Sequence, residues 1–419
     1  RQIPELSDDY VRFYEPAKMQ LLNLREYKGR KLKLLNLMLD SKTNTTKTFA
    51  SLVMVARAIE HVKKTGENIL MLVTTSGNKG TALRSAVERA ISLGLVQSKQ
   101  LRIITLVPKN SQHKLRKSRL FDDQELFKLN PIVIYTGKNP SDVKKIGTDF
   151  QEQYSEEFYK KYNTRIWLSL NINNYKVPDS VRAFFEYENL LHHGTDSLLK
   201  ARIHTHPVSS AFGFLGYHLG RTILEKEGLT SWNDNPGYFL VQHLATPDMV
   251  LHYYFNSFDK SNLPKYNLDE TSSFYIQNEN FHFPIETFDI FENMESTFYS
   301  EKPSTSPEVS KMIQEFGGGG IVVSFKECLN KYKFIQEILS EQGIQIPDNY
   351  KSITEWALIM VLTGTFNAID RNIIPDDVEL TVHASGFATE NHFNQIPSNA
   401  LPEINEEQPV NNLRNLCLF

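Results

Sequence analysis

The stretch that decides the fold is Asn68–Leu95, which reads NILMLVTTSGNKGTALRSAVERAISLGL. Within it, Ile69–Val73 is a short apolar run of strand length, and Thr74–Gly80 is a turn rich in small residues. From Thr81 onward, apolar side chains recur at helical spacing. The stretch therefore predicts a strand, a tight glycine-containing loop and a helix. The backbone N–H groups and the positive dipole end at such a helix start favour an anion.

The loop by itself names no ligand. It matches neither the G-x-G-x-x-G pattern of dinucleotide-binding folds nor the G-x-x-x-x-G-K-[ST] pattern of phosphate-binding loops. An NAD- or ATP-binding enzyme therefore lacks its fingerprint here. Asn78 can reach a ligand with its amide or cap the helix. On this stretch alone, a plain turn between strand and helix is an equal alternative.

An upstream lysine sharpens the interpretation. Lys47 lies 29 residues before Ser76, one predicted helix and one predicted strand earlier. A lysine just before a helix, followed at that distance by T-S-G-N-K-G, resembles the fold-type II enzymes that use pyridoxal 5'-phosphate (PLP). Threonine synthase, cysteine synthase and the tryptophan synthase β chain are members. The resemblance implies that Lys47 forms the internal aldimine with PLP and is the catalytic residue.

The same resemblance assigns roles to the loop. It implies that Asn78 holds the oxygen beside the cofactor's aldehyde. It also implies that the substrate carboxylate is bound by Thr75, Ser76, Gly77 and Asn78.

Composition describes a chain with room for two or three domains. Its 419 residues are 40% hydrophobic and 23% charged, which is typical of globular proteins in water. The net charge of −3 gives no reason to expect nucleic acid or an anionic membrane as partner. Two cysteines, Cys328 and Cys417, support neither a disulfide framework nor a cysteine-rich metal site. No apolar run approaches the roughly 20 residues that span a bilayer. We expect a cytoplasmic protein.

Short apolar runs alternate with helical patterns along the chain, which indicates parallel βαβ units and an α/β fold. The pattern also predicts two basic helices, over Tyr27–Leu39 and Gln112–Phe121. The main predicted strands after the first are Leu101–Val107, Pro131–Tyr135, Arg165–Leu170, Gly237–Gln242 and Val378–Val382.

The resemblance implies two lobes, each with a mostly parallel twisted sheet flanked by helices, and a cofactor at the lobe interface. We assign residues 1–66 and 200–419 to the larger lobe, with an N-terminal extension and the PLP phosphate site. Residues 67–199 form the smaller mobile lobe with the S-G-N loop. Residues 256–310 are an insertion that lines the substrate entrance, forms a subunit contact or is a surface loop. Residues 388–419 are a C-terminal tail on the body or on a partner subunit.

The phosphate loop is where the chain departs from the family pattern. The family has a glycine-rich loop before a helix at this place, whereas here only Gly213 and Gly216 lie near the turn. Serine hydroxyls and backbone N–H groups can still bind a phosphate. The resemblance thus assigns the phosphate to Ser209, Ser210, Ala211, Phe212 and Gly213. The glycine run Gly317–Gly320 instead reads as a turn before a strand and a helix capped by Ser324 and Glu327.

A serine follows the last predicted strand. The resemblance to cysteine synthase places the Ser385 hydroxyl on the pyridine nitrogen of PLP, where threonine synthases carry threonine. A hydroxyl there leaves that nitrogen largely unprotonated. The resemblance then favours elimination or replacement at Cβ or Cγ over racemisation and transamination.

Histidines crowd one region of the chain and raise the question of a metal. His204 and His206 suit two ligands on one strand face, but the neighbouring sequence offers no cysteine or clear carboxylate partner. We therefore predict no metal, and interpret these histidines as structural or substrate-contacting. The others in the region are His192, His193 and His218.

Together these features predict a PLP-dependent lyase or transferase of amino-acid biosynthesis, similar to threonine synthase. Its partner would be a small-molecule amino-acid substrate, and the family habit is a homodimer. Arg116, Lys117, His204 and His206 are groups that could meet an anionic substrate. The alternative is a catalytically inactive fold-type II scaffold with a binding or regulatory role, suggested by the glycine-poor loop near residue 209. The presence of Lys47, Asn78 and Ser385 together argues against it.

Overall fold

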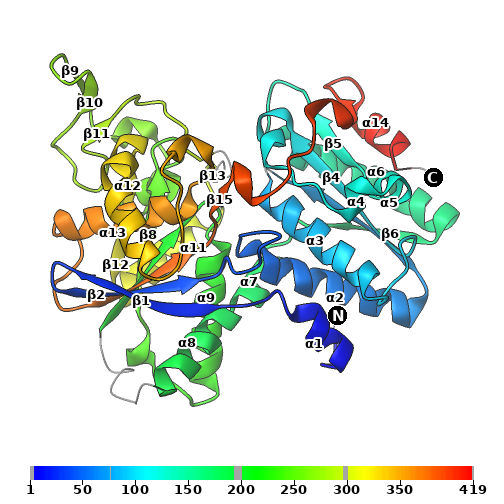
Figure 1. Cartoon of the computed structure of the whole chain (residues 1–419), viewed down its shortest axis with the longest axis horizontal. Helices are drawn as coiled ribbons and strands as arrows, with labels where there is room; N and C mark the ends of the chain where they lie inside the picture. The colour runs from blue at the N-terminus through cyan, green and yellow to red at the C-terminus, as the bar shows by residue number, and fades with distance from the viewer. Residues whose placement is uncertain (1–3, 76, 193–200, 296–300, 418–419) are drawn as a thin grey trace. The chain divides into compact units, whose positions relative to one another are not determined.

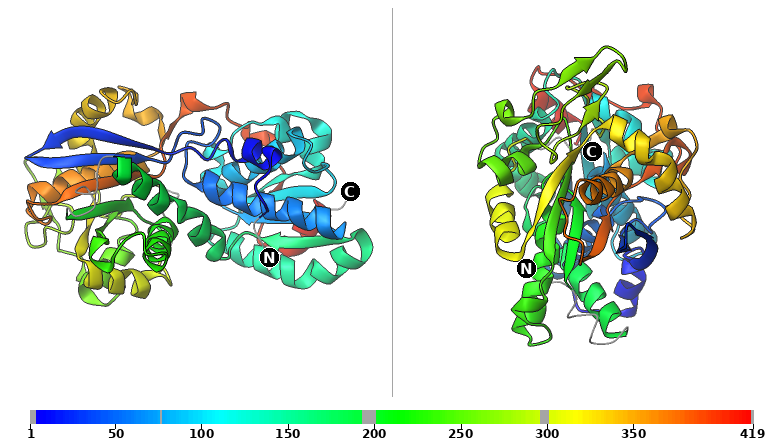
Figure 2. Two further views of the ribbon diagram at one scale, coloured as in Figure 1. Left: turned by 90° about the horizontal axis from the view of Figure 1, so that it is seen from below. Right: turned by 90° about the vertical axis from the view of Figure 1, so that its left-hand side faces the viewer.

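The computed structural model describes residues 4–75, 77–192, 201–295 and 301–417 (Figure 1). Its contacts divide the chain into two compact units. Unit 1 consists of Arg1–Lys18, Leu39–Pro178 and Glu390–Phe419, and unit 2 of Met19–Met38 and Asp179–Thr389. Each unit contains a parallel or mostly parallel sheet flanked by helices (Figures 1 and 2). The predicted α/β fold class is confirmed.

The described part of unit 1 contains a five-stranded sheet whose neighbouring strands all run parallel. In spatial order the strands are β16 (Glu403–Ile404), β5 (Ile132–Tyr135), β4 (Leu101–Pro108), β3 (Asn68–Thr74) and β6 (Thr164–Leu168). The helices are α1 (Asp8–Tyr14), α2 (Lys47–Thr65), α3 (Asn78–Ser92), α4 (Arg119–Asp122), α5 (Gln124–Leu129), α6 (Asp142–Tyr162), α7 (Asn173–Asp179) and α14 (Pro409–Asn415).

Both faces of the unit 1 sheet are buried. Leu70 and Leu72 of β3 pack in one cluster with Phe150 of α6 and Leu413 of α14. Because side chains alternate along a strand, the intervening residues of β3 point to the other face, where α2 and α3 pack. This explains why Asn68–Thr74 reads as a continuous apolar run rather than an alternating one.

Unit 2 contains, among its described residues, a six-stranded sheet in which only the first pair is antiparallel. Its strands, in spatial order, are β1 (Gln20–Tyr27), β2 (Arg30–Asn36), β14 (Glu379–Ala384), β7 (Arg202–Pro207), β8 (Gly237–His243) and β12 (Gly318–Val323). The helices are α8 (Val181–His192), α9 (Phe212–Lys226), α10 (Asp248–Phe255), α11 (Ser306–Phe316), α12 (Phe325–Ser340) and α13 (Ala357–Asp370). Smaller strands are β9 (Asn267–Asp269), β10 (Phe274–Ile276), β11 (Glu286–Thr287), β13 (Ile353–Glu355) and β15 (Ala388–Thr389).

Helix α13 forms the centre of the unit 2 core. Every residue from Ala357 to Ile369 is buried, and the helix contacts β7, β8, β12 and β14. Strand residues Val241, Ile321 and Val382 belong to the same hydrophobic cluster. A helix that is apolar on all sides needs such complete burial. None of the described helices is long and apolar enough to cross a membrane.

The predicted basic helix over Tyr27–Leu39 is wrong, because this segment contributes to the antiparallel hairpin β1–β2. Lys28 and Gly29 both have positive φ, 48° and 78°, as a two-residue hairpin turn requires. Beyond the turn, Leu32 and Leu34 are buried while Lys31 is exposed. This alternation with a period of two is the signal of a strand.

Two further sequence interpretations change. The helix predicted over Gln112–Phe121 is replaced by a 3₁₀ helix, Lys109–Lys114, and the short helix α4. The glycine run is a strand start rather than a turn, because Gly318–Gly320 already pair with β8. A Cβ on Gly318 would lie 1.9 Å from the carbonyl oxygen of Tyr238, so glycine lets these strands approach.

The two units divide the chain differently from the predicted lobes. Helix α2 packs on α3 and β3, so residues 39–66 belong with the predicted smaller lobe. The C-terminal tail also joins unit 1, because β16 pairs with β5 and Arg414 bonds Glu157. Residues 19–38 complete the sheet of unit 2 through the pairing of β2 with β14.

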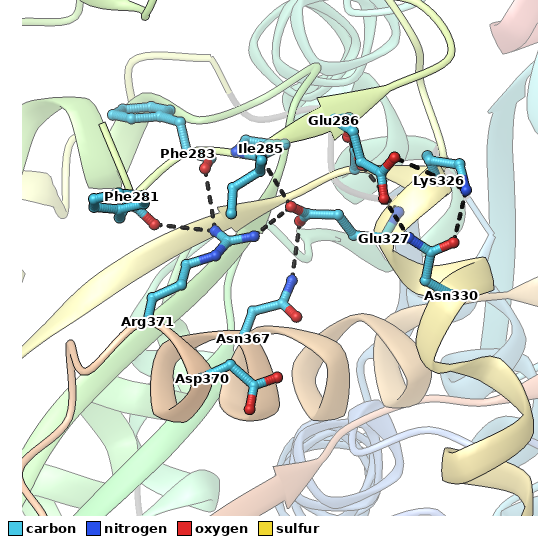
Figure 3. Close-up of polar contacts among 12 residues, drawn as sticks. Phe281, Phe283, Ile285, Glu286, Lys326, Glu327, Asn330, Asn367, Asp370 and Arg371 are labelled. Atoms are coloured by element: carbon cyan, nitrogen blue, oxygen red, sulfur yellow. Dashed lines mark hydrogen bonds and ion pairs between the residues drawn. The ribbon is translucent and has the colours of Figure 1, made fainter. Parts of the chain in front are cut away.

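The predicted insertion, residues 256–310, carries the small strands β9, β10 and β11 and is anchored on helices of unit 2 (Figure 3). Glu327 of α12 accepts hydrogen bonds from the backbone N–H of Ile285 at 2.9 Å and from Asn367 at 3.0 Å. Arg371 bonds Glu327 and also donates to the carbonyl oxygens of Phe281 and Phe283, at 3.0 and 3.1 Å. The insertion is therefore tied down by a buried ionic network.

Candidate functional site

The loop after β3 is shaped by Thr75. Its hydroxyl oxygen accepts hydrogen bonds from the backbone N–H groups of Gly77, at 3.0 Å, and Gly80, at 3.1 Å. Gly77 has φ 131°, and a Cβ there would lie 2.9 Å from Cβ of Lys114. Only glycine fits this backbone and this space. Ser76 lies outside the described residues. Asn78 is the first residue of α3.

Lys47 lies in the same unit and near this loop. It is the first residue of α2, and its carbonyl oxygen accepts a hydrogen bond from the Ser51 hydroxyl at 2.8 Å. Its Nζ is 5.9 Å from the ring centroid of Tyr175, and Nζ of Lys79 is 5.9 Å from the same centroid. Tyr175 is buried and donates to the carbonyl oxygen of Ser169 at 2.8 Å. A fixed aromatic ring thus brings the Lys47 amine beside the residue that follows Asn78.

Lys79 is a site residue that the sequence prediction missed. Burial, with repulsion from Lys144 and Lys47, lowers the pKa of Lys79 to about 7. Burial also lowers the pKa of Lys144. Lysines in such surroundings keep a share of neutral amine near neutral pH, which suits proton transfer or nucleophilic attack. The only sequence signal was a lysine directly after Asn78.

Unit 1 also holds a cavity of about 270 Å³ with a basic lining. It includes Arg116 and Lys117, which the sequence singled out for an anionic ligand. Thr81 and Ser85 of α3 lie on its wall, so the cavity begins one helical turn after Asn78. The other cationic and titratable residues of the lining are Lys42, Arg84, Glu88 and His392. A larger cavity of about 710 Å³ lies along β6. Lys47 and Asn78 line neither cavity.

The predicted phosphate loop in unit 2 connects β7 to α9. Its backbone turns sharply, because Ala211 has φ 53° and α9 begins at Phe212. The carbonyl oxygen of Ser210 accepts a hydrogen bond from Thr305 at 3.1 Å. The loop therefore ends at the N-terminus of a 15-residue helix, where the positive end of the helix dipole favours an anion.

Arg182 lies against this loop and was not predicted. A Cβ built on Gly213 would lie 2.6 Å from Nη2 of Arg182, so the guanidinium contacts the first turn of α9. Arg182 is buried and bonds Asp179 through Nε at 3.0 Å and Nη2 at 2.6 Å. The absence of a side chain at Gly213 thus leaves room for the Arg182 guanidinium. This role differs from that of the glycines in the phosphate loop of the family pattern. Arg182 lies on α8, so no local motif could reveal it.

Ser385 follows β14, the strand next to β7 in the sheet. The two strands are parallel, so Ser385 and the loop after β7 lie at the same carboxyl-terminal edge, where open α/β sheets bind ligands. The next residue, Gly386, is fixed by a 2.9 Å hydrogen bond from the N–H of Leu358 to its carbonyl oxygen. The structure brings these two predicted segments together within unit 2.

The histidines singled out from the sequence lie in different surroundings. His192 is exposed at the end of α8, His193 lies outside the described residues, and His218 bonds the Tyr238 hydroxyl at 2.9 Å. His204 and His206 are fully buried on β7.

Solved structures with this fold include enzymes that use PLP. The chain is similar to a PLP-dependent aspartate racemase, with a TM-score of 0.54 and 13% identity over 93% of this chain and 98% of that chain. For threonine synthase from yeast the TM-score is 0.56, with 12% identity over 97% and 82% of the two chains. For an L-serine ammonia-lyase from Rhizomucor miehei it is 0.51, with 14% identity over 88% and 94%. At these identities the likeness shows the fold, which is the fold-type II fold that the sequence predicted.

No curated protein matches the sequence. One family model does match, over residues 1–416, and its description is "Family of unknown function (DUF6002)". That match covers nearly the whole chain of 419 residues. The chain therefore belongs to the DUF6002 family.

Proposed function

We propose that this chain is a PLP-dependent enzyme that acts on an amino acid by elimination or replacement at Cβ or Cγ, similar to threonine synthase. The observation that carries the proposal is the position of Lys47. It begins α2, and its amine and that of Lys79 each lie 5.9 Å from the ring centroid of Tyr175. Lys79 follows Asn78 at the start of α3, after the loop that ends β3. The similarity to PLP-dependent racemase, lyase and synthase structures supports it.

The residues fit the cofactor. Lys47 would carry PLP, Asn78 would bind its phenolic oxygen, and Ser385 would face its pyridine nitrogen. The phosphate would be held by Ser209, Ser210, Ala211, Phe212 and Gly213, with Arg182 beside the first turn of α9. The buried Arg182 supplies the charge that a phosphate needs, so the shortage of glycine does not argue for an inactive scaffold. When bound, PLP supplies an electron sink for a carbanion at Cα.

The proposal gives other residues separate tasks. Thr75 shapes the loop through its two accepted hydrogen bonds, while the backbone around Gly77 and Asn78 would bind the substrate carboxylate. Lys47 would move the α-proton as general acid and base. We further expect a homodimer, which sedimentation equilibrium tests.

The substrate side chain we propose is anionic. The basic cavity of unit 1 begins at Thr81, one turn along α3 from Asn78, and carries Arg116 and Lys117. A volume of about 270 Å³ has room for a phosphate or carboxylate group, and the cationic lining favours such a group. Arg84 in its wall is almost fully buried.

The first experiment locates the cofactor on the chain. The protein is incubated with PLP, reduced with borohydride and digested, and mass spectrometry identifies the modified lysine. We expect modification at Lys47 and loss of the near-visible absorption band in Lys47→Ala. Lys64→Ala is the matched control, because Lys64 lies exposed in the last turn of the same helix. Modification at Lys79 instead would overturn the assignment of Lys47. If no lysine is modified, the proposal that the chain is a PLP-dependent enzyme is overturned.

A second experiment tests the reaction class. Serine, threonine and their O-phosphorylated and O-acylated homologues are incubated with the holoprotein, and keto acid, ammonia and replacement products are measured. We expect products of elimination or replacement, fastest with an O-phosphorylated substrate. Inversion at Cα without any elimination product would contradict the proposed class.

A further inference from the structure

Three histidine side chains meet inside unit 2 on adjacent parallel strands. His204 and His206 lie on β7, and His383 lies on β14, where the strand register pairs Thr381 with His204. One ring nitrogen from each histidine lies within 4.8 Å of the other two. The exposed fractions of the three residues are 0%, 2% and 0%. No sequence motif around His204 predicts its contact with His383, which is 179 residues away.

A carboxylate orients the first of these rings. Oε1 of Glu186, on α8, lies 3.0 Å from Nε2 of His204, and the Tyr217 hydroxyl donates to the other oxygen. Nε of Arg202 lies 3.4 Å from the same oxygen of Glu186, and this cation favours the ionised carboxylate. An ionised carboxylate accepts a hydrogen bond from Nε2–H of His204, which leaves Nδ1 of His204 as an acceptor that faces Nε2 of His383, 2.9 Å away. A carboxylate behind a histidine is the usual outer partner of a metal-binding imidazole.

Two ring nitrogens of the cluster have no hydrogen-bond partner among the residues that the structure describes. These are Nε2 of His206 and Nδ1 of His383. A buried polar atom left without a partner costs about 1–3 kcal/mol, so an unexplained pair in one place calls for a ligand.

We propose that His204, His206 and His383 bind a divalent first-row transition metal, with Zn²⁺ as the expected ion. Imidazole nitrogens suit such metals, and Zn–N bonds of about 2.1 Å would bring the three nitrogens to roughly 3.4 Å from one another. The rings of His206 and His383, whose centroids are 3.8 Å apart, would turn and separate to reach that geometry. The metal would join β7 to β14 and, through Glu186, to α8. The metal proposal does not depend on the proposed role of Lys47, although the cluster lies near Arg182, which that role places beside the PLP phosphate.

The surrounding charges define the fourth ligand. Arg182, Arg202 and Arg221 are buried in the same region, and its carboxylates include Glu186, Asp179 and Glu379. Glu186 and Asp179 are already paired with arginines, so they compensate a bare dication poorly. The fourth position, which no cluster histidine fills, therefore suits an anion such as hydroxide or chloride.

The test measures metal in the intact protein. Because the rings are buried, the chain is expressed in medium with added Zn²⁺, so that metal enters during folding, and is then dialysed. We expect stoichiometric zinc by mass spectrometry in the wild type and more than tenfold less in His206→Gln and His383→Gln. His243→Gln is the matched control, since His243 is equally buried on the neighbouring strand β8 and should leave zinc unchanged.

A second measurement decides the matter if a variant fails to fold. Anomalous scattering at the zinc edge from wild-type crystals should place the ion among the three histidines. Wild-type protein that emerges metal-free from media with zinc, cobalt, nickel or copper would overturn the proposal and leave a water as partner of the orphan nitrogens. Zinc bound elsewhere, or retained equally in both cluster variants, would overturn it as well.

Discussion

Lys79 shows how one side chain can set the acid–base behaviour of a site. It follows Asn78 in the first turn of α3, and its amine shares the Tyr175 ring with Lys47. The pKa of Lys79 is lowered to about 7 by burial and by Lys144 and Lys47. Above that pH the amine is neutral, and below it the ammonium adds a positive charge beside Lys47. The proton on Lys79 therefore links the site to pH in the physiological range.

This linkage gives a prediction for the pH profile. In the wild type, kcat/KM for the best substrate should rise with pH through about 7, as Lys79 loses its proton. Lys79→Met removes the titrating group, so this limb should disappear from the profile. Lys144→Met is the matched comparison: it should keep the limb but move it to higher pH, because the Lys144 charge is one cause of the lowered pKa of Lys79. A limb near pH 7 that persists unchanged in Lys79→Met would assign it to another group.

Helix α9 carries the clearest case of an element adapted at one position. Alanine is usually better than glycine inside a helix, yet Gly213 leaves room for the Arg182 guanidinium at the first turn. We predict that Arg182→Met weakens PLP binding by about 10- to 100-fold, the loss of one or two charge-assisted hydrogen bonds. Gly213→Ala should weaken it in the same direction, because its Cβ displaces the guanidinium. Binding is measured by titration of the apoprotein with PLP.

The matched control for this prediction is Arg221, which lies on α9. Arg221 is also fully buried, but it bonds the carbonyl oxygen of Asp234 at 2.9 Å and the side chain of Asn235. Arg221→Met should lower the melting temperature and leave the dissociation constant of PLP unchanged. Equal loss of PLP affinity in both arginine variants would show that Arg182 acts only through the stability of the unit.

Elements were predictable where their signal is local. The run Asn68–Val73 and the loop after it identify β3 and α3 because strand, turn and helix follow in sequence. The hairpin β1–β2 was misread, although the alternation of Leu32 and Leu34 with lysines and the Lys28-Gly29 turn both indicate it. There the leucine- and lysine-rich composition outweighed the period of two.

Contacts between distant segments were beyond the reach of the sequence. His383 joins His204 only through the register of β14 on β7, and Glu186 joins them from a helix. Arg182 reaches the loop near Gly213 in the same way. Parallel sheets place remote segments side by side, so their polar clusters carry no sequence motif. The assignments of Lys47, Asn78 and Ser385 rest on the family resemblance and remain predictions.

At the scale of the whole molecule, each unit carries one cysteine. Cys328 is buried on α12 in unit 2, and Cys417 is buried after α14 in unit 1. Burial raises the pKa of both thiols, so neither reacts until its surroundings open. The rate at which each thiol is alkylated therefore reports the local opening of its own unit.

This pair of thiols tests whether the C-terminal segment belongs to unit 1. Leu413 of α14 is fully buried in the cluster that contains Phe150 and Leu72. Leu413→Ala should destabilise this packing by about 2–5 kcal/mol and so speed alkylation of Cys417 by at least roughly tenfold. Alkylation of Cys328, followed on the same sample by mass spectrometry, should keep its rate. The reverse control is Ile335→Ala in the core of unit 2, which should speed Cys328 alone. If Leu413→Ala speeds both thiols equally, the two units open as one, and their division by contacts does not describe how the chain unfolds.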